Sequence, residues 1–289
     1  MENKQYITVF GATGRVGGAV LRLLSQAQIP VIAVTRNLNK TTEIPGVQWM
    51  AAEMTTRETL YRAMENSSTV FLASATDEQM VQAQCNVIEV AREQGVQHIV
   101  KLSSAMADPN ASLFIARAHG QIEEKLRSSG LAGTLLRPNG FMQNWLLGVA
   151  HTVKAQRKIF EPTGDGKRTY IDMLDIAEAA CKILMQPSQH MGQAYLLSGG
   201  EAISYHELAA LLSTVLQEDV VYVPVSEEAA RQKMEQRGLP SWAIETFLAY
   251  AAEQRQHQAG WISPDLPALL GKPARTVVSF VSAHKHAFQ

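Results

Sequence analysis

Short apolar runs alternate with longer amphipathic stretches along the first half of the 289-residue chain. The short runs are rich in β-branched and aromatic residues, which is typical of buried strands. They predict strands at Tyr6–Phe10, Pro30–Val34, Val47–Ala51, Thr69–Ala73 and His98–Leu102. Apolar residues at helical spacing predict helices at Arg57–Asn66 and Glu78–Gln94. Strands that alternate with helices predict an α/β fold whose parallel sheet is covered on both faces.

The second half of the chain continues with mixed elements. A strand is predicted at Thr134–Arg137 and a helix at Leu174–Met185. Ser204 and Glu207 have the spacing of a capping box, which predicts the start of a further helix.

Three glycines, Gly11, Gly14 and Gly17, occupy the turn between the first predicted strand and the first predicted helix. Such a turn leaves backbone N–H groups unpaired at the positive end of a helix, where phosphate binds. The spacing is that of a dinucleotide-binding loop, and an ordinary strand-to-helix turn is the alternative. We expect the cofactor to contact Gly11, Thr13, Gly14, Arg15, Val16 and Gly17.

The end of the second predicted strand indicates which dinucleotide binds. An NAD site usually has an acidic residue there for the ribose 2′-hydroxyl, but this chain continues with Arg36 and Lys40. Together with Arg15, these cations favour NADP(H) over NAD(H), because guanidinium groups bind a 2′-phosphate well. In the alternative interpretation, Arg36 and Lys40 are solvated surface cations.

Polar residues follow several other predicted strands. In open parallel sheets the ligand lies beyond the carboxyl ends of the strands. Ser74 and Asn139 are therefore candidate cofactor contacts, and Ser103 and Ser104 are candidates for the chemistry. Each could instead cap a helix or form a turn.

Charge and composition narrow the function classes. The chain has 26 basic and 27 acidic residues, so no broad attraction to nucleic acid or to an anionic membrane is expected. No apolar run has the length of a membrane span. The two cysteines are far apart and predict reduced, buried thiols in the cytoplasm. His284 and His286 do not predict a metal site.

Four segments together resemble the NmrA-like family of atypical short-chain dehydrogenase/reductases: GATGRVGG, HIVKLSSA, HGQIEEKLRSSGLAGTLLRPNGFMQNW and TYIDMLDIAEAACKIL. The resemblance implies a Rossmann-type doubly wound parallel sheet that binds NADP(H) or NAD(H). It assigns this domain to residues 1–150, with a return of 174–199 to the sheet. Residues 151–289 would form a smaller α/β lobe that covers the substrate.

The resemblance also identifies a departure at the catalytic positions. Short-chain dehydrogenases commonly carry a Tyr-x-x-x-Lys pair, and this chain has Ile115 and His119 at those positions. Reductases similar to this chain also lack the tyrosine, and an electrophilic acceptor needs little acid catalysis. His119 is the best candidate for a ribose contact or a proton donor, and a packed histidine is the alternative. Ser103 or Ser104 would orient a substrate carbonyl.

Residues near His119 and after the strand Thr134–Arg137 have possible roles in the site, each with a structural alternative. Lys101 is expected to be structural or to contact the ribose at most. Glu123 lies one helical turn after His119 and either orients the imidazole or forms a routine surface pair. Proteins similar to this chain line the substrate pocket with the residues that correspond to Phe141, Met142, Asn144 and Trp145. Their spacing is equally typical of core packing.

These features predict a reductase that transfers hydride from NADPH to a small planar quinone, dye, enone or imine. The alternative is a non-catalytic NADP(H) sensor that regulates a protein partner. The expected partner of the reductase is a small-molecule substrate, without nucleic acid or membrane. A homo-oligomer is compatible with the sequence.

Overall fold

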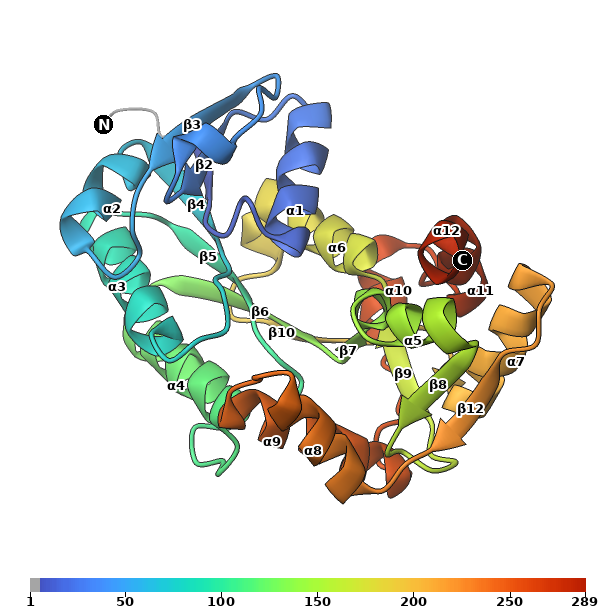
Figure 1. Cartoon of the computed structure of the whole chain (residues 1–289). Coiled ribbons are helices and arrows are strands. Elements are labelled where there is room, and N and C mark those ends of the chain that lie inside the picture. The colour runs from blue at the N-terminus through green and yellow to red at the C-terminus, as the bar shows by residue number, and fades with distance from the viewer. Residues whose placement is uncertain (1–5) are drawn as a thin grey trace. The chain divides into compact units, whose positions relative to one another are not determined.

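The computed structural model describes residues 6–289, except for the side chain of Lys40. Contacts within the chain divide it into two units (Figure 1). The first unit contains residues 6–138 and Met173–Leu196. The second unit contains Asn139–Asp172 and Leu197–Gln289.

The first unit is built on a seven-stranded sheet with the order β10-β6-β5-β4-β1-β2-β3. Its strands are β1 (Tyr6–Val9), β2 (Val31–Thr35), β3 (Val47–Ala51), β4 (Ser67–Leu72), β5 (His98–Leu102), β6 (Ala132–Pro138) and β10 (Ala194–Leu197). Strands β1 to β6 pair in parallel. The strand order reverses between β1 and β4, and dinucleotides bind at such a reversal. The expected doubly wound α/β sheet is confirmed.

Helices cover both faces of this sheet. They are α1 (Arg15–Gln26), α2 (Arg57–Met64), α3 (Met80–Glu93), α4 (Phe114–Ser128) and α6 (Met173–Met185), with short 3-10 turns at Leu38–Lys40 and Pro187–Gln189. Helices α1 and α6 pack together on one face, and α2, α3 and α4 lie in a row on the other (Figure 1). Because both faces are covered, all five residues of β2 are buried, which explains its uninterrupted apolar sequence.

The boundaries of two helices differ slightly from the sequence pattern. The helix predicted at Arg57–Asn66 ends at Met64, and Asn66 adopts a positive φ of 61° before β4. Asparagine tolerates this left-handed conformation, so it forms the turn and does not continue the helix. The helix predicted at Glu78–Gln94 runs from Met80 to Glu93.

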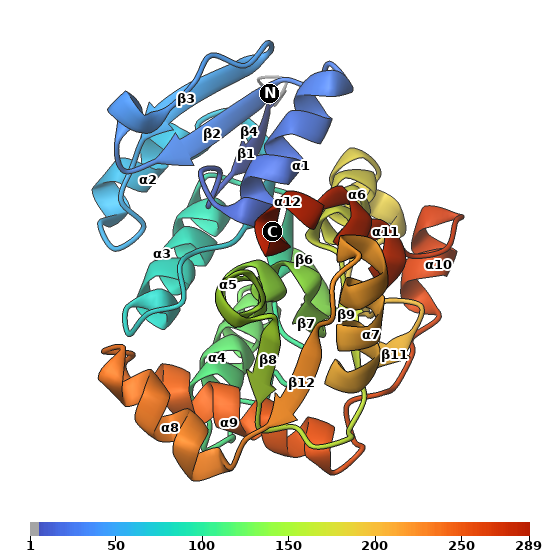
Figure 2. The same ribbon diagram turned by 45° about the vertical axis from the view of Figure 1, so that its right-hand side comes forward.

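The second unit has two small sheets (Figure 2). Their strands are β7 (Gly140–Phe141), β9 (Arg168–Ile171) and β11 (Ala202–Ile203) in one sheet, and β8 (Lys158–Glu161) and β12 (Val221–Pro224) in the other. The helices are α5 (Val149–Gln156), α7 (Tyr205–Leu216), α8 (Glu227–Gln236), α9 (Ser241–Arg255), α10 (Asp265–Leu270), α11 (Val277–Ala283) and α12 (Lys285–Phe288), with a 3-10 turn at Met142–Leu146. Ser204 and Glu207 form the predicted capping box before α7.

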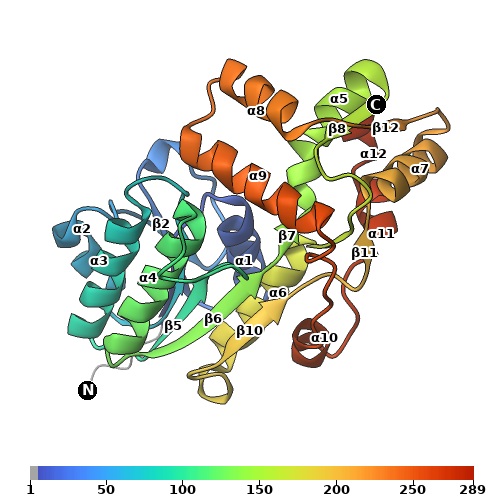
Figure 3. The ribbon, with the colours of Figure 1, turned by 90° about the horizontal axis from the view of Figure 1, so that it is seen from below.

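The second unit has its own apolar core. The Trp145 ring lies 4.6 Å from the Tyr170 ring and 5.9 Å from the Phe280 ring, measured between centroids. Helices α8 and α9 pack side by side through Met234 and Leu248 (Figure 3). Among the described residues, no helix has the length and apolar character that a bilayer crossing requires.

Candidate functional site

The loop after β1 is shaped by glycines. Gly11 has a φ of +71°, and a Cβ added to it would lie 2.8 Å from the Ala73 carbonyl oxygen. A Cβ on Gly17 would lie 2.2 Å from the Gly11 oxygen, which is closer than atoms can approach. The Gly14 N–H donates to the Gly11 oxygen over 2.9 Å and closes the turn. The loop therefore lies against the end of β4, at the point where the strand order reverses.

The N-terminus of α1 is open at this loop. Gly14 is the N-cap residue and offers no side chain to the first-turn N–H groups, and that turn has no acidic residue. Thr13, Gly14 and Arg15 are exposed, whereas the Val16 side chain is buried. Free N–H groups and the positive helix end fit a pyrophosphate group, which they could hold through the backbone.

Two arginines lie close to this loop in the fold. Arg36 directly follows β2, and the register of β1 with β2 brings its backbone to the same sheet edge as Gly11. Both Arg36 and Arg15 are exposed, and neither has a hydrogen-bond or ionic partner among the described residues. Their guanidinium groups are available to an anionic ligand. The side chain of Lys40 lies outside the described part of the chain.

The hydroxyl group of Ser74, after β4, is already hydrogen-bonded. Its Oγ donates to the Ala75 oxygen and accepts from Gln84 Nε2, each over 2.9 Å. The second amide atom of Gln84, Oε1, is buried without a hydrogen-bond partner. Ser74 could contact a cofactor through one remaining lone pair.

A buried carboxylate joins α4 to β5 and β6. Glu123 is 1% exposed, and its Oε1 accepts from Ser103 Oγ over 2.6 Å and from Arg137 Nε over 3.0 Å. Its Oε2 accepts from Arg127 over 2.7 Å and also from Arg137. Burial favours a raised pKa for Glu123, but the hydrogen bonds from Arg137 and Ser103 outweigh it and lower the pKa. The hydroxyl proton of Ser103 is therefore used in a hydrogen bond to Glu123, which also pairs with Arg137.

His119 does not pair with Glu123, contrary to one expectation from the sequence. Its Nδ1 lies 3.1 Å from Nζ of Lys101, which also donates to the Leu102 oxygen over 3.2 Å. Lys101 is 0% exposed and His119 is 9% exposed. Burial lowers the pKa of Lys101 to about 7. Burial, and then the nearby Lys101, lower the pKa of His119 well below its usual range, so the imidazole is neutral.

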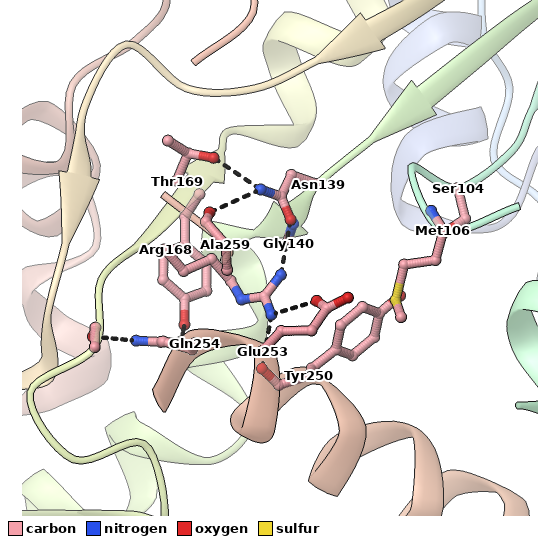
Figure 4. Close-up of polar contacts among 12 residues, drawn as sticks. Ser104, Met106, Asn139, Gly140, Arg168, Thr169, Tyr250, Glu253, Gln254 and Ala259 are labelled. Atoms are coloured by element: carbon pink, nitrogen blue, oxygen red, sulfur yellow. Dashed lines mark hydrogen bonds and ion pairs between the residues drawn. The ribbon is translucent and has the colours of Figure 1, made fainter. Parts of the chain in front are cut away.

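Ser104 differs from Ser103 in its hydrogen bonding. Its Oγ accepts from the Met106 N–H over 3.2 Å, and it donates no hydrogen bond to a described residue (Figure 4). The hydroxyl proton of Ser104 is therefore available to a ligand at the carboxyl end of β5. Of the two serines, only Ser104 fits the expected role of orienting a substrate carbonyl.

The side chain of Asn139 makes all its hydrogen bonds within the second unit. Its amide nitrogen donates to Thr169 Oγ1 over 2.8 Å and to the Ala259 oxygen over 3.4 Å (Figure 4). Its amide oxygen accepts from Arg168 over 2.8 Å and from the Gly140 N–H over 2.9 Å. All hydrogen-bonding positions of the amide are used. Asn139 therefore cannot bind a cofactor through its side chain in this structure.

The four expected pocket residues do not share one environment. Met142 is 0% exposed and Trp145 is 1% exposed, and both belong to the core of the second unit. Their burial favours the core-packing interpretation of the sequence pattern over a place on an open pocket. Phe141 is half-buried and Asn144 is exposed, so these two remain candidates.

Comparison with known proteins agrees with this geometry. A family model described as the NmrA-like family matches residues 3–267. The chain belongs to the NmrA-like family. Over 285 residues it is 35% identical to the NAD(P)H azoreductase of Xenophilus azovorans, and the match covers 98% of this chain and 99% of that protein.

Two solved structures resemble this NmrA-like chain over nearly its full length. The NADPH-dependent quinone oxidoreductase of Escherichia coli, complexed with NADPH, has a TM-score of 0.87 and 26% identity, with 97% and 99% of the two chains covered. The triphenylmethane reductase of Citrobacter sp., complexed with NADP(H), has a TM-score of 0.83 and 26% identity, with 98% and 99% covered.

Sequence reasoning missed the contact between Lys101 and His119 in the NmrA-like chain. The signal was present, because a lysine inside the apolar strand His98–Leu102 must find a polar partner when both faces of the sheet are covered. The network of Arg168 with Asn139 was also missed. No local pattern indicates it, since the two residues are brought together only by strand pairing.

Proposed function

We propose that this chain is an NADPH-dependent reductase that transfers hydride to a small planar electrophile. The observation that carries the proposal is the open glycine loop at the strand-order reversal, which fits a dinucleotide pyrophosphate. The 35% identity to a protein named NAD(P)H azoreductase supports the reaction class. The likeness to quinone and triphenylmethane reductases supports an electron-poor, conjugated acceptor.

The preference for NADP(H) over NAD(H) rests on Arg36 and Arg15. Both side chains are exposed near the loop and have no partner among the described residues. A 2′-phosphate would give Arg36 a charge-assisted hydrogen bond, whereas the 2′-hydroxyl of NADH would not.

The chemistry requires little from the protein. NADPH supplies a hydride when it is bound. Ile115 is buried and apolar and cannot donate a proton. Ser104 can donate a hydrogen bond to the acceptor, and the neutral His119 can do the same or contact the nicotinamide ribose. Quinones and cationic dyes are electrophilic before any protonation, whereas an enone or an imine yields a more basic anion and gains more from these donors.

A non-catalytic NADP(H) sensor is the second candidate. The absence of a tyrosine at position 115 favours it, because that residue normally supplies the acid. The sensor would require a protein partner, whereas the reductase requires only a small-molecule substrate. The free thiols of Cys85 and Cys181 fit a reducing compartment, so we propose a cytoplasmic location for either function.

The test combines turnover with binding. NADPH oxidation is followed with azo dyes, quinones, triphenylmethane dyes and enones, and NADPH and NADH are titrated by calorimetry. We expect NADPH-dependent loss of at least one acceptor above the uncatalysed rate, and tighter binding of NADPH than of NADH. Tight NADPH binding without turnover of any acceptor would contradict the reductase and favour the sensor.

A further inference from the structure

Lys101 is an unusual residue for the interior of a parallel sheet. Its ammonium group is removed from solvent on β5, and its polar contacts are the Leu102 oxygen at 3.2 Å and His119 Nδ1 at 3.1 Å. Burying a lysine without a counter-ion in hydrogen-bond contact is costly. A merely structural position would be filled better by an apolar residue, so the contact with His119 needs an explanation.

The contact determines where the imidazole carries its proton. An ammonium group has three donors and no acceptor, so His119 Nδ1 must accept from protonated Lys101. The ring proton of the neutral imidazole then lies on Nε2. Nε2 of His119 has no hydrogen-bond partner among the described residues. It is not one of their four side-chain atoms that are both fully buried and unpartnered. Solvent, or a ligand, therefore reaches this N–H.

We propose that Lys101 is a positioning residue that holds His119 as the Nε2–H tautomer and replaces the proton that His119 gives to the reduced acceptor. The inference rests on the proposed reductase function. In this proposal, the Lys101–His119 pair supplies the proton that a tyrosine supplies in other short-chain dehydrogenases. Lys101 acts only through His119, because its own side chain has no exposed surface.

The proton transfer balances along this pair. An uncharged acceptor such as an enone carries a negative charge once it has received a hydride from the bound cofactor. The Nε2–H bond of His119 breaks as its proton passes to this anion. Nδ1 takes a proton from Lys101 as an Nζ–H bond breaks, so the ring stays neutral in its other tautomer. Lys101 is left as an amine until a proton returns from solvent through His119.

The charges around the pair suit this role. Glu123 on α4 acts on Lys101 through space and favours its charged form, but burial is the larger effect and lowers its pKa to about 7. Cys85 on α3 also faces Lys101, and burial raises the pKa of this thiol, so it stays neutral. On β6, Arg137 is paired with Glu123. Lys101 can therefore exchange a proton near neutral pH.

The first test measures the tautomer directly and needs no turnover. The imidazole nitrogens of His119 are observed by NMR in protein labelled with ¹⁵N-histidine, and the signals are assigned with His119→Gln. At a pH about one unit below the pKa of Lys101, where its ammonium form predominates, we expect Nε2 to be protonated and Nδ1 unprotonated in the wild-type protein. We expect Lys101→Met to give a mixture of His119 tautomers. The control His98→Gln, at the opposite end of β5, should leave the His119 signals unchanged. A wild-type ring that is protonated on Nδ1, or charged, would overturn the proposal.

The second test separates proton supply from structural damage. An enone yields a basic enolate that needs an acid, whereas the anion of a reduced quinone is stable in water. Lys101→Met should therefore lower kcat for an enone by roughly 10–100-fold and for a quinone by less than about 3-fold, with KM for NADPH unchanged. Equal losses for both acceptors would contradict proton supply. If wild-type protein reduces no acceptor, the proposed function fails, and the NMR result still decides the tautomer.

Discussion

At the scale of single residues, the proposed preference for NADP(H) depends on Arg36. It is exposed at the end of β2 and has no ionic partner among the described residues. A free guanidinium loses little when it binds an anion, because no existing ion pair must break. Its contribution should therefore appear in the affinity for a phosphorylated ribose.

Arg36→Ala should weaken NADPH binding by about 10–100-fold, which corresponds to one charge-assisted hydrogen bond. The affinity for NADH should change by less than about 2-fold, since NADH lacks the 2′-phosphate. Calorimetric titration with both cofactors measures the effect. Arg92→Ala, which removes an exposed arginine at the far end of α3, is the matched control. Equal weakening of both cofactors would contradict the assignment.

Residue roles that depend on distant partners were harder to predict than Arg36. Glu123 has the spacing of a surface pair with His119, yet it is buried and binds Ser103 and Arg137. The partners are chosen by the packing of α4 on β5 and β6, which no local pattern encodes. Met142 and Trp145 show the same limit, because an aromatic and a methionine at helical spacing are equally typical of a core and of a pocket.

At the scale of elements, the proposed cofactor site depends on the N-terminus of α1. Its N-cap residue is a glycine with extended backbone angles and no capping side chain. A glycine at the N-cap makes the helix less stable by a few tenths of a kcal/mol than a good N-cap residue would. It leaves the first-turn N–H groups for a phosphate.

Gly14→Asp separates the stability of α1 from its binding function. Aspartate is a favourable N-cap residue, but its Cβ would lie 3.1 Å from the Gly11 oxygen, a close contact that opposes the gain. The free energy of unfolding should therefore stay within about 1 kcal/mol of the wild-type value. The carboxylate would occupy the first-turn N–H groups and repel the pyrophosphate, so NADPH affinity should fall by at least about 100-fold. Urea denaturation and calorimetry measure the two effects.

Gly130→Asp adds the same charge before β6, at the opposite edge of the sheet, where a Cβ meets no atom within 4 Å and the φ of +80° is one that aspartate tolerates better than most residues. This control should leave NADPH binding unchanged. Retention of NADPH affinity in Gly14→Asp would show that the pyrophosphate does not bind at α1.

At the scale of the whole molecule, buried histidines make stability depend on pH. His98 Nε2 lies 2.8 Å from Thr134 Oγ1, whose own proton goes to the His190 oxygen over 2.5 Å. His98 therefore donates from Nε2, and its Nδ1 is buried without a partner. Burial, and then the neighbouring His190, lower the pKa of His98 to about 4.

The protein should therefore lose stability in mild acid. Between pH 6.5 and pH 4 the unfolded chain binds a proton at His98 that the folded chain does not, so the free energy of unfolding falls as pH falls. At pH 5 the contribution is about 2 kcal/mol. His98→Gln should reduce the loss measured by urea denaturation between pH 7 and pH 5 by about this amount. An unchanged loss would contradict a neutral, buried His98.

The overall fold was the most predictable level. Strand and helix patterns depend on neighbours along the chain, so the parallel order and the glycine loop could be predicted from runs such as Tyr6–Phe10. The network of Asn139 with Arg168 and Thr169 could not, because strand β9 brings these residues together from about thirty positions away.

The most direct test of the central claim is a single-turnover reaction with the protein in excess over a quinone. NADPH absorbance and quinone absorbance are followed together after mixing. We expect both to fall at the same rate and in a one-to-one ratio, and we expect Gly14→Asp to abolish the reaction. If bound NADPH persists, and the quinone decays no faster with the wild-type protein than with this variant, then the chain is not a hydride-transferring reductase.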